Sequence, residues 1–69
     1  MERISSLELI ISLLKEGHVI TYKPYNNPRN FLILKGDKKI KVFNEHLSYY
    51  INEDDLKELA NLFEFYLYN

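Results

Sequence analysis

Residues 31–43 read FLILKGDKKIKVF, and this stretch decides the fold class of the chain. The runs before and after the central Gly36-Asp37 pair are rich in β-branched and aromatic residues, which favour strands. Gly36-Asp37 is a two-residue connection of the Gly-X type that tight hairpins use. In the second run, Ile40 and Val42 alternate with lysines, so one face is apolar and the other is basic. The stretch therefore predicts an antiparallel hairpin with one buried face.

More strands are expected on both sides of this hairpin. Residues 18–23 show the same period of two, and residues 46–51 have the composition of a short further strand. Residues 24–30 contain two prolines and three asparagines, which indicates a loop. Together these segments predict an antiparallel meander of three strands with a short fourth strand.

The two ends of the meander adjoin expected helices. Apolar residues recur at helical spacing from Ser6 to Glu16, and Ser5-Ser6-Leu7-Glu8 fits a capping box in which Ser5 caps the helix. Asn52 is expected to cap a second helix, because acidic residues fill the turn that follows it. The fold class is α+β, in the order α-β-β-β-(β)-α, with both helices on one face of the sheet.

The length of 69 residues allows a single domain spanning residues 1–69. Domains this small usually need a disulfide, a metal ion or self-association for stability. The chain has no cysteine, and His18 and His46 lack the spacing of a zinc site. We therefore expect no metal and no cofactor, and we expect a homodimer.

An apolar run at residues 7–14 is too short to span a bilayer, and Glu8 interrupts it. No small-residue cleavage site follows it, so it does not read as an export signal. The expected location is the cytoplasm, without membrane attachment. Catalysis is not expected either, because no histidine stands in an arrangement with a nucleophile and an orienting carboxylate.

The aromatic end of the sequence is the strongest candidate for a binding surface. If the second helix continues to the end, Phe63, Tyr66 and Leu67 face one way; if the chain forms a strand, Tyr66 and Tyr68 share one side. Tyrosine suits interfaces because it buries apolar area and keeps a hydroxyl group for a partner. The expected partner-binding residues are Tyr49, Tyr50, Phe63, Phe65, Tyr66, Leu67 and Tyr68.

The charges are segregated along the chain, with most basic residues before Phe43 and most acidic residues after it. Such a molecule can dock head to tail or present one charged pole to a partner. The basic hairpin is an alternative site, where aromatic side chains beside cations would hold a nucleic acid. Its expected residues are Lys23, Arg29, Lys35, Lys39 and Lys41. The net charge of −1 lacks the strong basic bias of a dedicated nucleic-acid binder.

In size, A/T-codon-biased composition and the run from Ile51 to Leu56 followed by the aromatic close, the chain resembles small accessory proteins of phages and prophages of low-GC Gram-positive bacteria. The resemblance implies a non-enzymatic protein that inhibits a host enzyme or a bacterial defence system by stoichiometric binding. The alternative is a small nucleic-acid-binding regulator that uses the basic hairpin.

Overall fold

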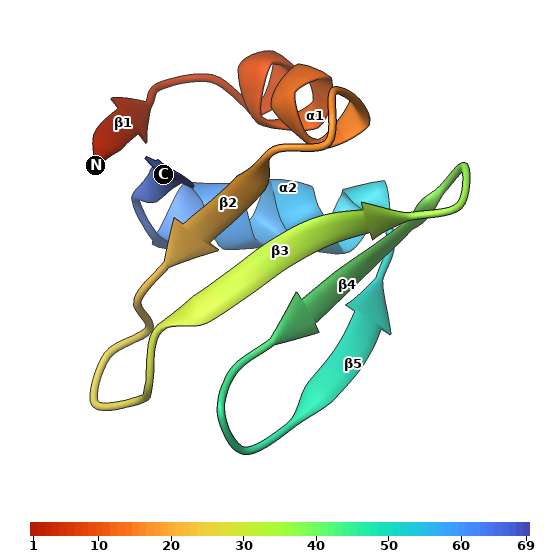
Figure 1. Cartoon of the computed structure of the whole chain (residues 1–69). Coiled ribbons are helices and arrows are strands. Elements are labelled where there is room, and N and C mark those ends of the chain that lie inside the picture. The colour runs from red at the N-terminus through yellow and green to blue at the C-terminus, as the bar shows by residue number, and fades with distance from the viewer.

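The hairpin expected from residues 31–43 is present in the structure, a computed structural model that describes all 69 residues. Two helices lie on one face of a six-stranded antiparallel sheet (Figure 1). The elements in chain order are β1 (Glu2–Ile4), α1 (Leu7–Lys15), β2 (Val19–Tyr22), β3 (Asn30–Lys35), β4 (Lys39–Phe43), β5 (Ser48–Ile51), α2 (Glu53–Leu62) and β6 (Phe65–Tyr68). The α+β class and the meander of β2 to β5 are confirmed.

The sheet has two strands that the sequence did not predict as part of it. Its strand order is β1-β6-β2-β3-β4-β5, and every neighbouring pair is antiparallel. The chain leaves the meander through α2 and returns as β6, which lies between β1 and β2. β6 therefore hydrogen-bonds on both edges, whereas β1 and β5 form the edges of the sheet.

Cross-strand pairing fixes which side chains share a face. Ile20 lies opposite Leu32, and Leu32 lies opposite Val42, so these three residues point to the same side. All three are completely buried, because both helices cover this side. Ile10 and Leu14 of α1 and Leu56 of α2 complete the same core. The opposite face carries the alternate residues and no helix.

The register of the hairpin is determined by which residues the core buries, and it differs from the register that a two-residue turn at Gly36-Asp37 would give. Lys35 pairs with Lys39, so the connection has three residues, 36–38, rather than the expected two. A two-residue turn would place Lys41 opposite Leu32 and direct its ammonium group into the core. The observed register instead places Val42 there, and Gly36 accommodates the turn with φ of 68°.

The start of α1 differs from the expectation by one residue. Ser6, not Ser5, is the N-cap, and its hydroxyl oxygen accepts a hydrogen bond from the Leu9 backbone N–H at 3.2 Å. Glu8 forms no capping box, because it is too close in sequence to Ser6 to occupy the third helical position. Gly17 follows the helix with φ of 91°, as expected of a terminating glycine.

The start of α2 confirms the predicted cap. The Asn52 side chain accepts a hydrogen bond from the Asp55 backbone N–H at 2.9 Å, and the Asp55 carboxylate accepts one from the Asn52 N–H at 3.1 Å. This reciprocal pair is a capping box. It fixes the direction in which α2 leaves β5 and therefore where β6 returns to the sheet.

Of the two geometries considered for the aromatic end, the chain adopts the strand. Phe65 is only 2% exposed and stacks on Tyr22, with 4.7 Å between the ring centroids. Leu67 also packs against the core, whereas Tyr66 and Tyr68 point to the opposite face. The tail thus contributes to the core and to the uncovered face at once.

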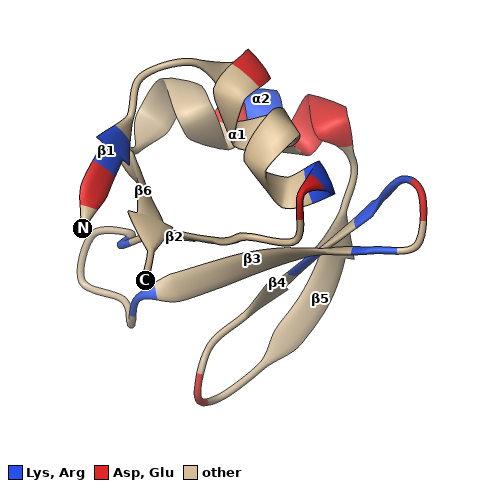
Figure 2. Cartoon of the chain, turned by 45° about the horizontal axis from the view of Figure 1, so that its top comes forward, with Lys and Arg blue, Asp and Glu red and all other residues tan.

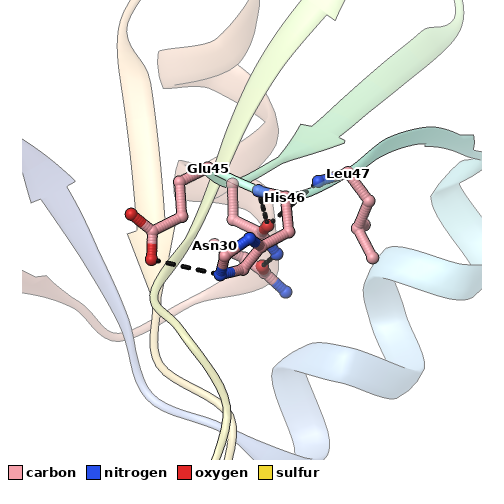
Figure 3. A network of polar contacts seen from close by, with 5 residues as sticks. Asn30, Glu45, His46 and Leu47 are labelled. Carbon is pink, nitrogen blue, oxygen red and sulfur yellow. Dashed lines mark hydrogen bonds and ion pairs between the residues drawn. The ribbon is translucent and has the colours of Figure 1, made fainter.

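A polar network lies at one end of β3, and Figure 3 shows the part of it that joins Asn30 to the turn after β4. The Asn30 side chain donates to the Tyr22 hydroxyl at 3.1 Å and accepts from the Asn44 side chain at 2.8 Å. The Asn44 oxygen accepts from the backbone N–H groups of His46 and Leu47, at 2.8 and 3.2 Å. The network therefore ties β2 and β3 to the turn between β4 and β5. No buried side-chain polar atom lacks a partner.

We predict that Phe65→Ala lowers the free energy of unfolding by about 3 to 5 kcal/mol, because it empties a buried site beneath both helices. Tyr68→Ala, in the same strand, is the matched control and should cost about 1 kcal/mol or less, since Tyr68 is 47% exposed. Urea unfolding followed by circular dichroism measures both values. Equal losses in the two variants would contradict the central place given to β6.

We also predict that stability decreases at high pH. Burial raises the pKa of Tyr22 from 10.0 to about 12, partly offset by the Asn30 hydrogen bond. The folded state holds the Tyr22 hydroxyl proton more tightly than the unfolded chain does. The contribution of Tyr22 to the free energy of unfolding is therefore complete below about pH 10 and is lost as the pH rises to about 12. Urea unfolding over this pH range should show that the free energy of unfolding decreases less in Tyr22→Phe than in the parent protein. An identical decrease in that variant would assign the effect to other groups.

Candidate binding surface

The uncovered side of the sheet, here called the open face, is built from residues that alternate with the core positions. Thr21 pairs with Tyr66 on one side and with Phe31 on the other, and Phe31 pairs with Phe43. These pairs place side chains from four strands in one row across the sheet. The open face consists of Arg3, Val19, Thr21, Phe31, Ile33, Lys35, Lys39, Lys41, Phe43, Ser48, Tyr50, Tyr66 and Tyr68. Of these, Thr21 is completely buried beneath its neighbours.

The composition of this face is unusual for a sheet with helices on one side. The solvated face of such an antiparallel sheet normally carries polar side chains. Here the aliphatic side chains of Val19 and Ile33 lie near aromatic side chains; both are partly buried, and no helix lies over them. Tyr50 and Tyr68 are 57% and 47% exposed. Exposed aromatic rings beside partly exposed aliphatic side chains on this side of the sheet are typical of an interaction site.

The aromatic side chains of the open face support one another. The Phe31 ring meets the Tyr68 ring edge to face, with centroids 5.0 Å apart, and the Phe43 ring at 5.7 Å. Pairs in these geometries are favourable by about 0.5 to 1.5 kcal/mol beyond the area they bury. The rings are therefore held in place before any partner arrives, which reduces the entropy that binding would cost.

Cations lie among the aromatic rings. The Lys39 ammonium lies 5.9 Å from the centroid of Tyr50, and the Lys41 ammonium lies 5.8 Å from that of Phe43. At one end of the face, the Arg29 guanidinium donates to the Thr21 hydroxyl at 3.3 Å. Each of these three cationic groups contacts a ring or a hydroxyl group and can still bind an anion.

The segregation of charge in the sequence corresponds to a segregation in space. The basic residues of the hairpin lie along β3 and β4, and a run of acidic residues lies at the beginning of α2 (Figure 2). Six of the ten acids lie on the helices or at their ends, and the side chains placed on the open face include lysines and Arg3 but no acid, although the whole chain has a net charge of −1. The local field, rather than the net charge, determines what this face attracts.

One acid borders the open face. The Glu64 carboxylate lies 3.6 Å from the Arg3 guanidinium and accepts a hydrogen bond from the Tyr66 hydroxyl at 2.8 Å. This hydrogen bond raises the pKa of Tyr66. Glu64 thus holds Tyr66 at the edge of β6, although the exposed ion pair contributes little stability.

The residues expected to bind a partner are divided between both sides of the sheet. Tyr50, Tyr66 and Tyr68 lie on the open face. Phe65 and Leu67 belong to the core, and Phe63 packs between Tyr22 and Tyr25. Tyr49 lies opposite Val42 and so points to the helix side, 43% exposed. The structure thus leaves three of the seven residues on one common surface.

Three of the five residues expected to bind nucleic acid fall on the same surface. Lys35, Lys39 and Lys41 share the open face, as the strand alternation predicted. Arg29 reaches its edge, and Lys23 lies beyond β2 beside a pocket that Arg29 also lines. The two candidate sites, separate in the sequence, are therefore parts of one face. Sequence reasoning missed Phe31, Ile33 and Phe43, although the uninterrupted apolar run in β3 was a readable sign of a strand that is apolar on both faces.

The structure contains no group of three or more His, Asp or Glu side chains placed to hold a metal ion. Neither helix combines the length and the apolar character that a membrane crossing requires. Comparison with known proteins gives no significant match to any family model, curated protein or solved structure.

Proposed function

We propose that the protein is a non-enzymatic interaction module that binds one partner protein through its open face. The observation that carries this proposal is the aromatic and aliphatic surface formed by alternate residues of β2, β3, β4 and β6, on the side of the sheet that no helix covers. The surface has the composition of an energetic hot spot, because tyrosine and arginine are enriched at such positions.

The charges of the open face indicate the chemistry of the partner. Lys35, Lys39 and Lys41 lie beside the aromatic rings, so an acidic surface on the partner would be attracted and oriented. Contact between the open faces of two identical copies would instead oppose like charges. The homodimer expected from the small size of the chain remains a prediction, and the charge distribution favours contact of the open face with the acidic side of α2.

The mode of action that we propose is occlusion of a functional surface on a host enzyme or a bacterial defence component in the cytoplasm. The resemblance to phage accessory proteins supports this choice of partner, and the pre-packed rings of the open face support stoichiometric binding. No reaction is required, since a partner whose working surface is covered is already inhibited.

We predict that Tyr50→Ala combined with Tyr68→Ala weakens capture of the partner at least about tenfold, because both rings are exposed on the open face. The partner would first be captured with the tagged chain from a lysate of a low-GC Gram-positive bacterium, with and without nuclease. Its affinity would then be measured with the purified protein. Leu9→Ala, which removes a 46% exposed side chain from α1, is the control. A folded double variant that binds as tightly as the parent would refute the role of the open face.

A second function is favoured by one specific observation, the mixture of lysines and aromatic rings on a single sheet face. Single-stranded nucleic acids are held by this combination, through stacking of bases and release of counterions. If the open face binds a strand, the affinity for a short single-stranded oligonucleotide should fall steeply as salt increases.

Fluorescence anisotropy at several salt concentrations measures this dependence. Lys39→Gln combined with Lys41→Gln should make the plot of log affinity against log salt less steep, by the amount expected for about two lost phosphate contacts. Lys15→Gln on α1 is the control for charge. Absence of binding at low salt, or a slope that the double variant does not change, would dismiss this function and leave the protein partner.

A further inference from the structure

A pocket of about 580 Å³ lies at one end of the sheet, beside the open face. The loop between β2 and β3, the end of α2 and strand β1 surround it. Its volume falls within the range of sites for small organic molecules. Its characteristic side chains are Arg3, Lys23, Tyr25, Arg29, Phe63 and Tyr66.

The pocket carries an excess of positive charge. Three of its side chains are cations, whereas Glu64 is its one acid. Glu64 is already engaged by Arg3 and by the Tyr66 hydroxyl. Arg29 donates one hydrogen bond to the Thr21 hydroxyl, and Lys23 has no ion pair or hydrogen bond in the structure. Lys23 and Arg29 are therefore the two cations available to an anion in the pocket.

The loop between β2 and β3 holds the Tyr25 ring in place as one wall of the pocket. Tyr25 is 77% exposed, yet its ring packs against Phe63 with 5.4 Å between centroids. The loop is restrained by two prolines, by Asn26 in the left-handed conformation with φ of 55°, and by the Asn27 side chain, which donates to the Tyr25 carbonyl at 3.1 Å. An aromatic ring held in water at the mouth of a basic pocket is available for stacking.

We propose that this pocket binds a nucleoside phosphate, with the phosphate at Lys23 and Arg29 and the base against Tyr25. Lysine and arginine are the side chains that bind phosphate groups, and base stacking on an aromatic ring does not depend on the base. The same chemistry belongs to a free nucleotide and to the phosphorylated end of a single strand. The pocket shares Arg3 and Tyr66 with the open face, but Tyr50 and Tyr68, which test the protein partner, do not line it, so the two proposals can fail separately.

The test is a titration followed by nuclear magnetic resonance, with three probes: adenosine monophosphate, inorganic phosphate alone, and a short 5′-phosphorylated single-stranded oligonucleotide. Adenosine monophosphate should shift the signals of Lys23, Tyr25 and Arg29 and should bind about tenfold more tightly than inorganic phosphate, because stacking adds to the phosphate contact. An oligonucleotide that binds at least about tenfold more tightly than the mononucleotide identifies a strand end as the ligand; equal affinity identifies a free nucleotide.

Two variants and a control complete the test. Lys23→Gln should weaken the binding of adenosine monophosphate and of inorganic phosphate about tenfold each, whereas Tyr25→Ala should weaken adenosine monophosphate and leave inorganic phosphate unchanged. Both side chains are exposed, so the fold should survive. Lys15→Gln, a distant loss of one positive charge, should change nothing. No shift at millimolar nucleotide or oligonucleotide, or binding that is insensitive to Tyr25→Ala, would overturn the proposal.

Discussion

Strand β6 hydrogen-bonds to β1 along one edge and to β2 along the other, and the remaining architecture depends on this double pairing. Without β6, β1 has no neighbour and β2 becomes an unpaired edge. This strand places Phe65 in the core, where its ring stacks on that of Tyr22. The Tyr22 hydroxyl accepts a hydrogen bond from the Asn30 side chain. Asn30 is hydrogen-bonded to Asn44, which accepts hydrogen bonds within the turn between β4 and β5. One strand pairing thus supports contacts that extend to the opposite end of the sheet.

The same strand explains why a small domain has a large apolar face in water. Residues of a strand alternate between the two sides of a sheet, so burying Phe65 and Leu67 necessarily turns Tyr66 and Tyr68 outward. β3 repeats this arrangement, because Leu32 is in the core while Phe31 and Ile33 are on the open face. Two helices can cover only one side. The surplus of large side chains therefore gathers on the other side, together with the lysines of the hairpin.

Much of the fold was predictable because its signals are local. Helical spacing, the Asn52 cap and the alternation of Ile40 and Val42 with lysines act within a few residues. The hairpin turn was mispredicted because its length depends on which residues the core buries rather than on Gly36-Asp37 alone. β1 has only three residues and no recognisable period, and its existence depends on β6, some sixty residues away. The candidate surface was predicted as two separate sites, since pairing across strands is what joins them.

The placement of β6 also determines the order in which the molecule can assemble. Along residues 1–69, β1 precedes every other strand and β6 follows them all, yet these two strands are neighbours in the sheet. Until residues 65–68 emerge, β1 has nothing to pair with and β2 presents a free edge beside an incomplete core. Contacts between distant parts of a chain form slowly, and exposed strand edges invite association with other chains. The six-stranded sheet can therefore be completed only after residues 65–68 have been synthesised, and until then β1 and the free edge of β2 wait for their common neighbour.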